Sequence, residues 1–287
     1  MPSGFTGYLF ILAAALMWGT TGTFAKILFL QHLSYLQVSF LRSAVAFLIL
    51  FCAHMGSRRR QLKVASRDIP LLLAIGVTHT LFSLSYLRTI QLSSITQAVF
   101  LLYTYPIFVT VVARLFLKEL LSTTKLMALG GSVVGVILLT QVFNPAGLSM
   151  PWPAVVSGLT ASLIWTCSMI MLKLALRKYP AWTVLFFVLA FSTLFLTIIT
   201  KPGSFLLSMS VTGWLGAIGL GTCSTLAGVS FFYKGLRRVE ASRASILATL
   251  EPVVASSLGF IIFAETLPWS GFLGSGFILL GAILVQV

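Results

Sequence analysis

The chain has 287 residues, of which 58% are hydrophobic and only 8% are charged, and its mean hydropathy is +1.04. Soluble domains carry about 25% charged residues, so this composition excludes a soluble globular protein and indicates a chain that crosses a membrane several times. The net charge of +14 would suggest nucleic acid as a partner of a soluble protein. Lys and Arg also gather in the cytoplasmic loops of membrane proteins, so we expect a lipid bilayer around this chain and no nucleic-acid partner.

Apolar runs long enough to cross a bilayer, which takes about 20 residues, follow one another along the whole chain. They predict ten transmembrane helices at about 8–30, 36–55, 69–87, 95–117, 126–143, 154–175, 182–200, 214–233, 244–263 and 269–287. The uncharged, proline-rich segment 144–153 is the linker expected between two halves. We predict an all-α membrane protein with a first five-helix repeat at 1–143 and a second at 154–287.

The first two spans carry charged and aromatic residues inside their apolar runs. In the first, Trp18, Gly22 and Lys26 recur at intervals of four, so they share one face of the expected helix. Lys26 lies near the end of this span, where its side chain can either reach the headgroups or bind a substrate. Arg42 lies about a third of the way into the second span, and a charge at that depth needs a partner in the protein interior.

Polar and aromatic residues concentrate in the third and fourth spans. The third places His79, Ser83 and Tyr86 on one stripe, and the fourth contains Gln97, Tyr103, Tyr105, Pro106 and Arg114. A single histidine in a membrane is usually a hydrogen-bonded packing residue, and aromatic residues at helical spacing usually pack as well. We treat His79, Tyr86 and Tyr103 as candidate binding residues because Pro106 is expected to break the helix beside them.

The ninth span contains an acidic residue directly before a proline. Glu251 lies near the middle of the span, where a charge costs about 2.5 to 3.5 kcal/mol, so it should face a protein interior or a water-filled cavity. Pro252 has no N–H group, and it leaves the carbonyl of Ala248 without its helical donor. A freed carbonyl survives in a membrane only where protein or water satisfies it, so we expect a helix break there.

The distribution of positive charge predicts the topology. If the basic loop that begins at Arg58 is cytoplasmic, thirteen of the nineteen Lys and Arg residues fall in cytoplasmic loops and only Arg88 and Lys201 on the opposite side. The other four lie within spans. Both termini are then expected in the cytoplasm. Since five is odd, the second half enters the membrane from the opposite side to the first.

The two halves also share landmarks at a nearly constant offset. A shift of 146 residues relates Pro106 to Pro252, Glu119 to Glu265, Ala98 to Ala244 and Gly135 to Gly281, and a shift of 147 relates Trp18 to Trp165 and Lys26 to Lys173. Together with the odd number of spans, this duplication predicts an inverted repeat. Inverted repeats are typical of secondary transporters, whose binding site lies near the midplane between the repeats.

Several motifs resemble those of a known family. Trp18-Gly19-Thr20 through Lys26, Phe40-Leu41-Arg42, and Leu250-Glu251-Pro252 followed by Phe263-Ala264-Glu265 resemble the ten-helix drug/metabolite transporter (DMT) superfamily and, within it, the EamA-type carriers. Ala264 replaces a glycine of the family signature, and Tyr105 stands where many members have an acid. The resemblance implies transport of small metabolites, often export of amino acids, through a cavity lined by the first, third, fourth, sixth, eighth and ninth helices.

The sequence thus predicts a secondary transporter of the cytoplasmic (inner) membrane that moves an amino acid or a similar amphipathic solute, with export favoured. The expected substrate-binding residues are Trp18, Lys26, Arg42, His79, Tyr86, Tyr103, Trp165 and Glu251, and Glu251 is also the candidate for proton coupling. The alternatives are a channel or a lipid scramblase, and with less support a membrane-embedded enzyme. No G-x-S-x-G, H-E-x-x-H or Gly-rich phosphate motif is present.

No cofactor or metal is expected. The three cysteines Cys52, Cys167 and Cys223 all fall within apolar spans, and their spacing fits neither a metal site nor a disulfide framework. They are typical of small packing residues.

The predicted topology can be tested with single cysteines at Ser57 and Gly147, in a protein whose three native cysteines have been replaced. An impermeant thiol reagent should label Ser57→Cys only from the cytoplasmic face and Gly147→Cys only from the opposite face, because an odd number of spans separates them. Labelling of both from one face would contradict the inverted repeat.

Overall fold

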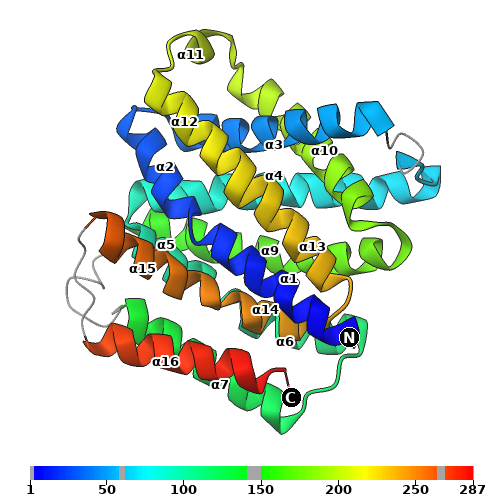
Figure 1. The fold of residues 1–287 in the computed structure, drawn as a ribbon, viewed down its shortest axis with the longest axis vertical. Coiled ribbons are helices and arrows are strands. Elements are labelled where there is room, and N and C mark those ends of the chain that lie inside the picture. Colours follow the sequence, from blue (N-terminus) through cyan, green and yellow to red (C-terminus); the bar gives the residue numbers. More distant parts are fainter. Residues whose placement is uncertain (1–2, 58–61, 141–149, 264–268, 287) are drawn as a thin grey trace.

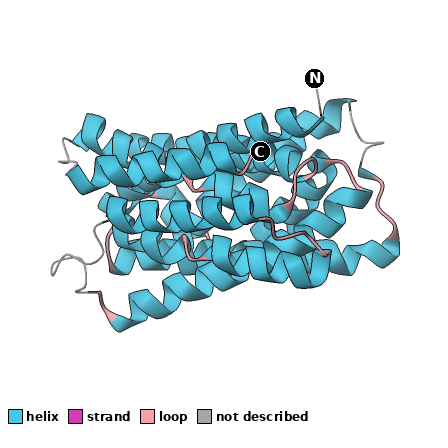
Figure 2. Ribbon diagram, turned by 90° about the horizontal axis from the view of Figure 1, so that it is seen from below, coloured by secondary structure: helices cyan, strands magenta, loops and turns pink. Residues whose placement is uncertain are grey.

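The structure is a computed structural model that describes residues 3–57, 62–140, 150–263 and 269–286. The described residues are almost entirely helical and contain no strand. Figures 1 and 2 show the helices packed side by side, with some of them inclined to others. The predicted all-α architecture of ten spans in two inverted five-helix repeats is confirmed.

The first repeat contains seven α-helices because two of its spans are interrupted. They are α1 (Ser3–Trp18), α2 (Thr21–Leu30), α3 (Tyr35–Ser57), α4 (Ile69–Leu92), α5 (Ile95–Leu102), α6 (Tyr105–Val112) and α7 (Thr123–Thr140). A short 3-10 helix, η2 (Ser66–Asp68), precedes α4, and a π-helix, η3 (Ala113–Leu117), extends α6.

The second repeat begins with the long helix α9 (Trp152–Lys178) and ends with α16 (Trp269–Leu284). Between them lie α10 (Ala181–Thr200), α11 (Gly203–Leu207), α12 (Val211–Gly219), the π-helix η4 (Leu220–Gly228), α13 (Val229–Leu236), α14 (Ala241–Ala248) and α15 (Leu250–Phe263). Eight helical stretches among the described residues are long and apolar enough to cross a membrane. The interrupted pair α14–α15 and the 16-residue α16 complete the ten.

The prediction of an unbroken first helix was wrong. Helix α1 ends at Trp18 and α2 begins at Thr21, so Trp18 and Lys26 do not share one continuous helix face. The hydroxyl of Thr20 donates a 2.7 Å hydrogen bond to the carbonyl of Met17 and so competes with the helical bonding at the break. Gly19 allows a close approach to α15, since a Cβ at this position would lie 2.5 Å from Cγ1 of Val254.

The fourth and ninth spans are broken directly before their prolines. Helix α5 ends at Leu102 and α6 begins at Tyr105, while α14 ends at Ala248 and α15 begins at Leu250. Pro106 and Pro252 therefore lie in the first turn of a new helix, where a backbone N–H has no intrahelical acceptor. The proline costs little at these positions, and each span gains polar backbone groups near its middle.

The two repeats pack against each other in reciprocal pairs. Helix α4, the third span of the first repeat, packs on α9, the first span of the second repeat. In the same way α1, from the first span of the first repeat, packs on α13, from the third span of the second. Equivalent spans also meet, since α7 packs on α16 and α3 on α10, and α6 of the fourth span packs on α14 of the ninth. Such reciprocal contacts are what a twofold axis between equivalent units produces, so the packing carries the inverted symmetry.

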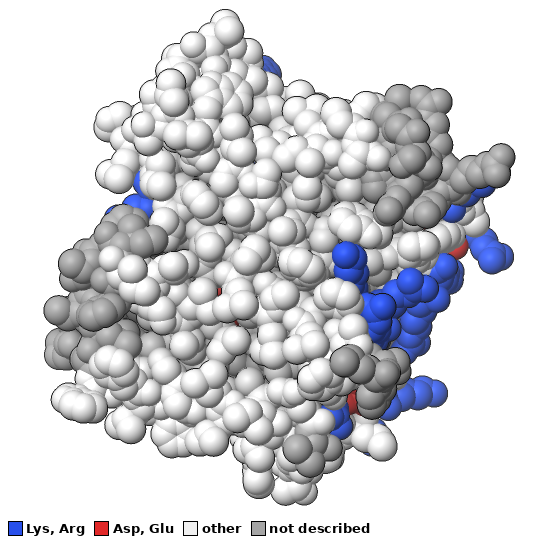
Figure 3. All heavy atoms as spheres, in the orientation of Figure 1, with Lys and Arg blue, Asp and Glu red and all other residues white. Residues whose placement is uncertain are grey.

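Basic side chains gather at one end of the helices, as Figure 3 shows along one edge of the molecule. Arg243 lies at this end, and its Nη1 donates to the hydroxyl of Tyr8 at 3.1 Å and to the carbonyl of Val285 at 2.8 Å. Both ends of the chain therefore lie here, and we call this the basic end. Arg58, Arg59 and Arg60, the 144–149 part of the linker, and Ala264 and Glu265 lie outside the described residues.

Helices α7 and α16 form a closely packed pair at one edge of the bundle (Figure 1). A Cβ added at Gly135 would lie 2.7 Å from the carbonyl oxygen of Gly274 and 2.9 Å from the backbone nitrogen of Ile278. The spacing of Gly131 and Gly135, which is typical of closely packed membrane helices, thus serves packing within the chain.

We expect Gly135→Ala to lower the free energy of unfolding by about 1 to 3 kcal/mol, because the added methyl group overpacks a backbone contact. Gly130→Ala on the same helix is the matched control, since a Cβ there meets no atom within 4 Å. The midpoint of thermal unfolding in detergent measures both variants. Equal midpoints would contradict the assigned role of Gly135.

Candidate functional site

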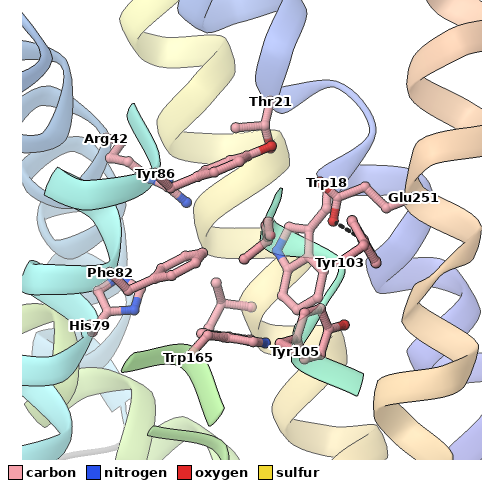
Figure 4. Close-up of a pocket in the computed structure, with 12 residues that line it drawn as sticks. Trp18, Thr21, Arg42, His79, Phe82, Tyr86, Tyr103, Tyr105, Trp165 and Glu251 are labelled. Carbon is pink, nitrogen blue, oxygen red and sulfur yellow. Dashed lines mark hydrogen bonds between the residues drawn. The ribbon is translucent and has the colours of Figure 1, made fainter. Parts of the chain in front are cut away.

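A small cavity lies where the broken spans of the two repeats meet. Its volume is about 30 Å³, which has room for water but not for an organic solute. Figure 4 shows side chains that converge on it from both repeats. They are Trp18, Thr21, Arg42, His79, Phe82, Tyr86, Leu102, Tyr103, Tyr105, Trp165, Val229 and Glu251.

The cavity gathers seven of the eight predicted binding residues, and Lys26 is not among those that line it. The six helices expected to line the cavity all contribute, and the second span adds Arg42. The predicted binding residues did not include five lining residues, namely Thr21, Phe82, Leu102, Tyr105 and Val229. Phe82 and Tyr86 are one helical turn apart and their rings stack with centroids 5.8 Å apart, so the spacing of Phe82 from Tyr86 could have identified it.

Aromatic rings form most of the cavity wall. Trp18 and Trp165, which occupy equivalent positions in the two repeats, meet edge to face with ring centroids 5.7 Å apart. Phe82 packs on Trp165 at 4.8 Å and Phe232 on Trp18 at 4.8 Å. The duplicated tryptophans thus bring both repeats into contact beside the cavity.

The Glu251 carboxyl group lies at the break between α14 and α15 and is 7% exposed. The hydroxyl of Tyr103, from the equivalent break in the first repeat, lies 2.7 Å from Oε2 of Glu251 and 2.9 Å from the carbonyl oxygen of Ala248. The sequence predicted that Pro252 frees this carbonyl, and the structure identifies Tyr103 as its donor. One side chain therefore stabilises both the helix break and the buried acid.

The Tyr103 hydroxyl has a single proton for these two acceptors. When this proton is donated to Ala248, a hydrogen bond between Tyr103 and Glu251 requires a proton on the Glu251 carboxyl group. When Glu251 is ionised, it competes with the Ala248 carbonyl for the proton of Tyr103. The protonation state of Glu251 is thus linked to the hydrogen bonding of the helix break.

The Arg42 guanidinium is 4% exposed and forms no ion pair with a described acidic residue. Its Nε instead donates to Oγ1 of Thr225 at 3.1 Å. Thr225 lies in the π-helix η4, and its own hydroxyl donates to the carbonyl of Leu220, five residues earlier, at 3.0 Å. The interior partner of Arg42 is therefore a neutral hydroxyl group, which no local sequence pattern predicts.

Figure 4 shows Arg42 and Glu251 on opposite sides of the cavity, with aromatic rings between them. His79 and Ser83, one helical turn apart on α4, are buried, and neither Nε2 of His79 nor Oγ of Ser83 has a hydrogen-bond partner within the described part of the chain. Within that same part, no three His, Cys, Asp or Glu side chains are placed to hold a metal ion.

We expect Tyr103→Phe to lower the free energy of unfolding by about 1 to 3 kcal/mol, because a buried carbonyl and a buried carboxyl group lose their donor. Tyr86→Phe is the matched control, since the Tyr86 side chain lines the same cavity and its hydroxyl forms no hydrogen bond with the described residues. Thermal unfolding in detergent at one scan rate compares the two. An equal loss in both variants would contradict the assigned role of Tyr103.

Known proteins resemble this chain over nearly its whole length. The model of the EamA-like transporter family matches residues 5–141 and again residues 152–287. An uncharacterized transporter of Archaeoglobus fulgidus is 29% identical, with 96% of this chain and 94% of that protein covered. The uncharacterized inner membrane transporter YicL of Salmonella typhimurium is 26% identical, with 100% and 97% covered.

More distant proteins share the architecture. The pseudopaline exporter CntI of Pseudomonas aeruginosa is 23% identical, with 80% of this chain and 78% of that protein covered. A solved crystal structure superposes with a TM-score of 0.81 at 15% identity, covering 97% of this chain and 95% of its own, which shows a common fold. Because the family model matches both halves, this chain belongs to the EamA-like transporter family and is an integral, multi-pass membrane transporter.

Proposed function

We propose that this protein is a secondary transporter of the cytoplasmic membrane that moves an amino acid or a similar amphipathic metabolite, with export as the physiological direction. The observation that carries the proposal is the cavity between the repeats, where a guanidinium and a carboxyl group lie on opposite sides of an aromatic enclosure. Arg42 is suited to the carboxylate of a zwitterion and Glu251 to its ammonium group. The rings of Trp18 and Trp165 are suited to its apolar part.

The small volume of the cavity supports a carrier over a channel. A space of about 30 Å³ cannot hold an amino acid, so a solute must induce or select a wider conformation. Alternating access between two inverted repeats provides such conformations around one central site. The likeness to an exporter and to an inner membrane transporter supports the direction and the location. By the same proposal, the basic end faces the cytoplasm, following the distribution of Lys and Arg.

Counterflow in vesicles tests the function. Purified protein is reconstituted in vesicles preloaded with one unlabelled amino acid at a time, and uptake of the same labelled compound is followed. We expect saturable accumulation for a free amino acid and none for its amide or its N-acetyl derivative, because each derivative lacks one charge. Flux that does not saturate would favour a channel, and movement of fluorescent phospholipid between leaflets would favour a scramblase.

Proton coupling is the second part of the proposal, and it rests on the shared proton of Tyr103. An imposed proton gradient should accelerate uphill solute flux by the native protein. Glu251→Gln should abolish this response and leave solute exchange partly intact, because an amide cannot take up and release a proton. Asp68→Asn is the control for loss of an acid, since Asp68 does not line the cavity and is bonded to Lys178 and Tyr179 rather than to α14.

An unchanged gradient response in Glu251→Gln would remove this residue as the coupling site. A native protein that exchanges solute without any response to the gradient would instead be a facilitative carrier.

A further inference from the structure

The carboxylate of Glu119 joins the two repeats at the basic end, away from the cavity. Glu119 belongs to the first repeat and is 8% exposed. Its Oε1 accepts from the backbone N–H of Ala241 at 2.7 Å, and its Oε2 accepts from the N–H of Ser242 at 3.0 Å and from the Ser242 hydroxyl. These donors lie in the first turn of α14, in the second repeat. A helix start has unpaired N–H groups and a partial positive charge, so Glu119 caps α14 from the other repeat.

The backbone around Glu119 is built to hold this position. Lys118 ends the π-helix η3 in the left-handed region, with φ of 58°, which is uncommon for a residue other than glycine. The N–H of Glu119 donates to the carbonyl of Ala113 at 3.3 Å, and Arg114 donates to the carbonyl of Glu119 at 3.3 Å. The chain reversal after the fourth span therefore directs Glu119 toward α14.

Two lysine side chains, one from each repeat, bind the turn that precedes α14. Lys173 donates through Nζ to the carbonyl of Leu236 at 2.6 Å and to that of Val239, so it satisfies carbonyls at the C-terminal end of α13. Lys125, in the first repeat, pairs with Glu240 at 2.9 Å. Partial burial raises the pKa of Glu240, but hydrogen bonds from Lys125 and Arg243 outweigh it and hold that pKa below its usual value, so Glu240 stays charged near neutral pH.

Helix α14 lies between this cluster and the cavity. All of its residues except Arg243 are buried, and it packs on α6, the helix that begins at Tyr105. Its last carbonyl, that of Ala248, accepts from Tyr103 beside the cavity, while its first N–H groups donate to Glu119. The fourth span of the first repeat therefore holds both ends of α14, with Tyr103 at the cavity and Glu119 at the basic end.

We propose that Glu119 is a gating residue: its cap on α14 keeps the path from the cavity to the basic end closed, and solute passes that way only after α14 leaves the cap. This inference rests on the proposed transport function, because a gate has meaning only for a transport path. In the closed state the buried carboxylate and the helix start satisfy each other. In the open state both must find water, which a path opening to that face supplies.

The test measures access to the cavity without any solute. A single cysteine replaces the cavity residue Thr21 in a protein whose three native cysteines have been replaced. Inverted and right-side-out vesicles are treated with an impermeant, cationic methanethiosulfonate reagent. We expect Glu119→Gln to raise the labelling rate from the basic end about tenfold, because loss of the anionic cap increases a minor open population.

Asp68→Asn is the matched control. Asp68 is a carboxylate at the same end and also joins the repeats, through Lys178 at 2.6 Å and Tyr179 at 2.7 Å, but it does not contact α14 in these bonds. It should leave the labelling rate from the basic end nearly unchanged. An equal increase in Asp68→Asn and Glu119→Gln would overturn the gate, because any loosening of the basic end would then suffice.

Ala241→Pro provides a second variant in case Glu119→Gln does not fold. Proline at the first position of a helix is well tolerated, and the preceding Glu240 has the extended backbone, φ −61° and ψ 149°, that proline requires. This variant removes the N–H that donates to Oε1 of Glu119 and leaves every charge in place. It too should raise the labelling rate.

Folded variants whose labelling from the basic end equals that of the native protein would overturn the proposal. A protein that moves no solute in counterflow, yet shows the increase in labelling, would contradict the proposed function while leaving the closure by Glu119 intact as a structural property.

Discussion

The absence of water inside a bilayer is the constraint on which this structure depends, because each backbone group released by a broken helix must find a partner in the protein. The ninth span satisfies this constraint with one hydrogen bond. Pro252 ends the helical bonding of Ala248, and the Tyr103 hydroxyl replaces the missing donor at 2.9 Å. Because Tyr103 comes from the corresponding break of the other repeat, the two breaks have to meet at the centre of the protein, and a cavity forms beside them.

The sequence predicts the parts of this arrangement that depend on neighbouring residues. It does not predict the parts that depend on contacts between distant residues. The position of Pro252 predicted which carbonyl is freed, since that relation spans four residues of one helix. Its donor comes from a residue 145 positions away, which no local pattern reveals. Arg42 shows the same limit, because burial of its charge was predictable from depth alone, whereas Thr225 becomes its partner only through the π-helix η4 and across 183 residues.

The interrupted first span shows a second kind of limit. The hydropathy of the segment from α1 to α2 is continuous, because Gly19 and Thr20, where the helix breaks, do not interrupt the apolar run. The contact beside this break, between Gly19 and Val254, lies between the repeats. The repeat itself was predictable, because duplicated landmarks such as Trp18 and Trp165 preserve their spacing, and the structure brings those two rings within 5.7 Å.

Symmetric architecture and asymmetric chemistry together define how the site can act. Tyr105 occupies the position in the first repeat that Glu251 occupies in the second, at an offset of 146 residues. The two related breaks therefore differ in chemistry, with a phenol in the first repeat and a carboxyl group in the second. That carboxyl group shares Tyr103 with the last carbonyl of α14, and the first N–H groups of the same helix are bound to Glu119. The cavity and the basic end are therefore bonded to opposite ends of one buried helix, α14.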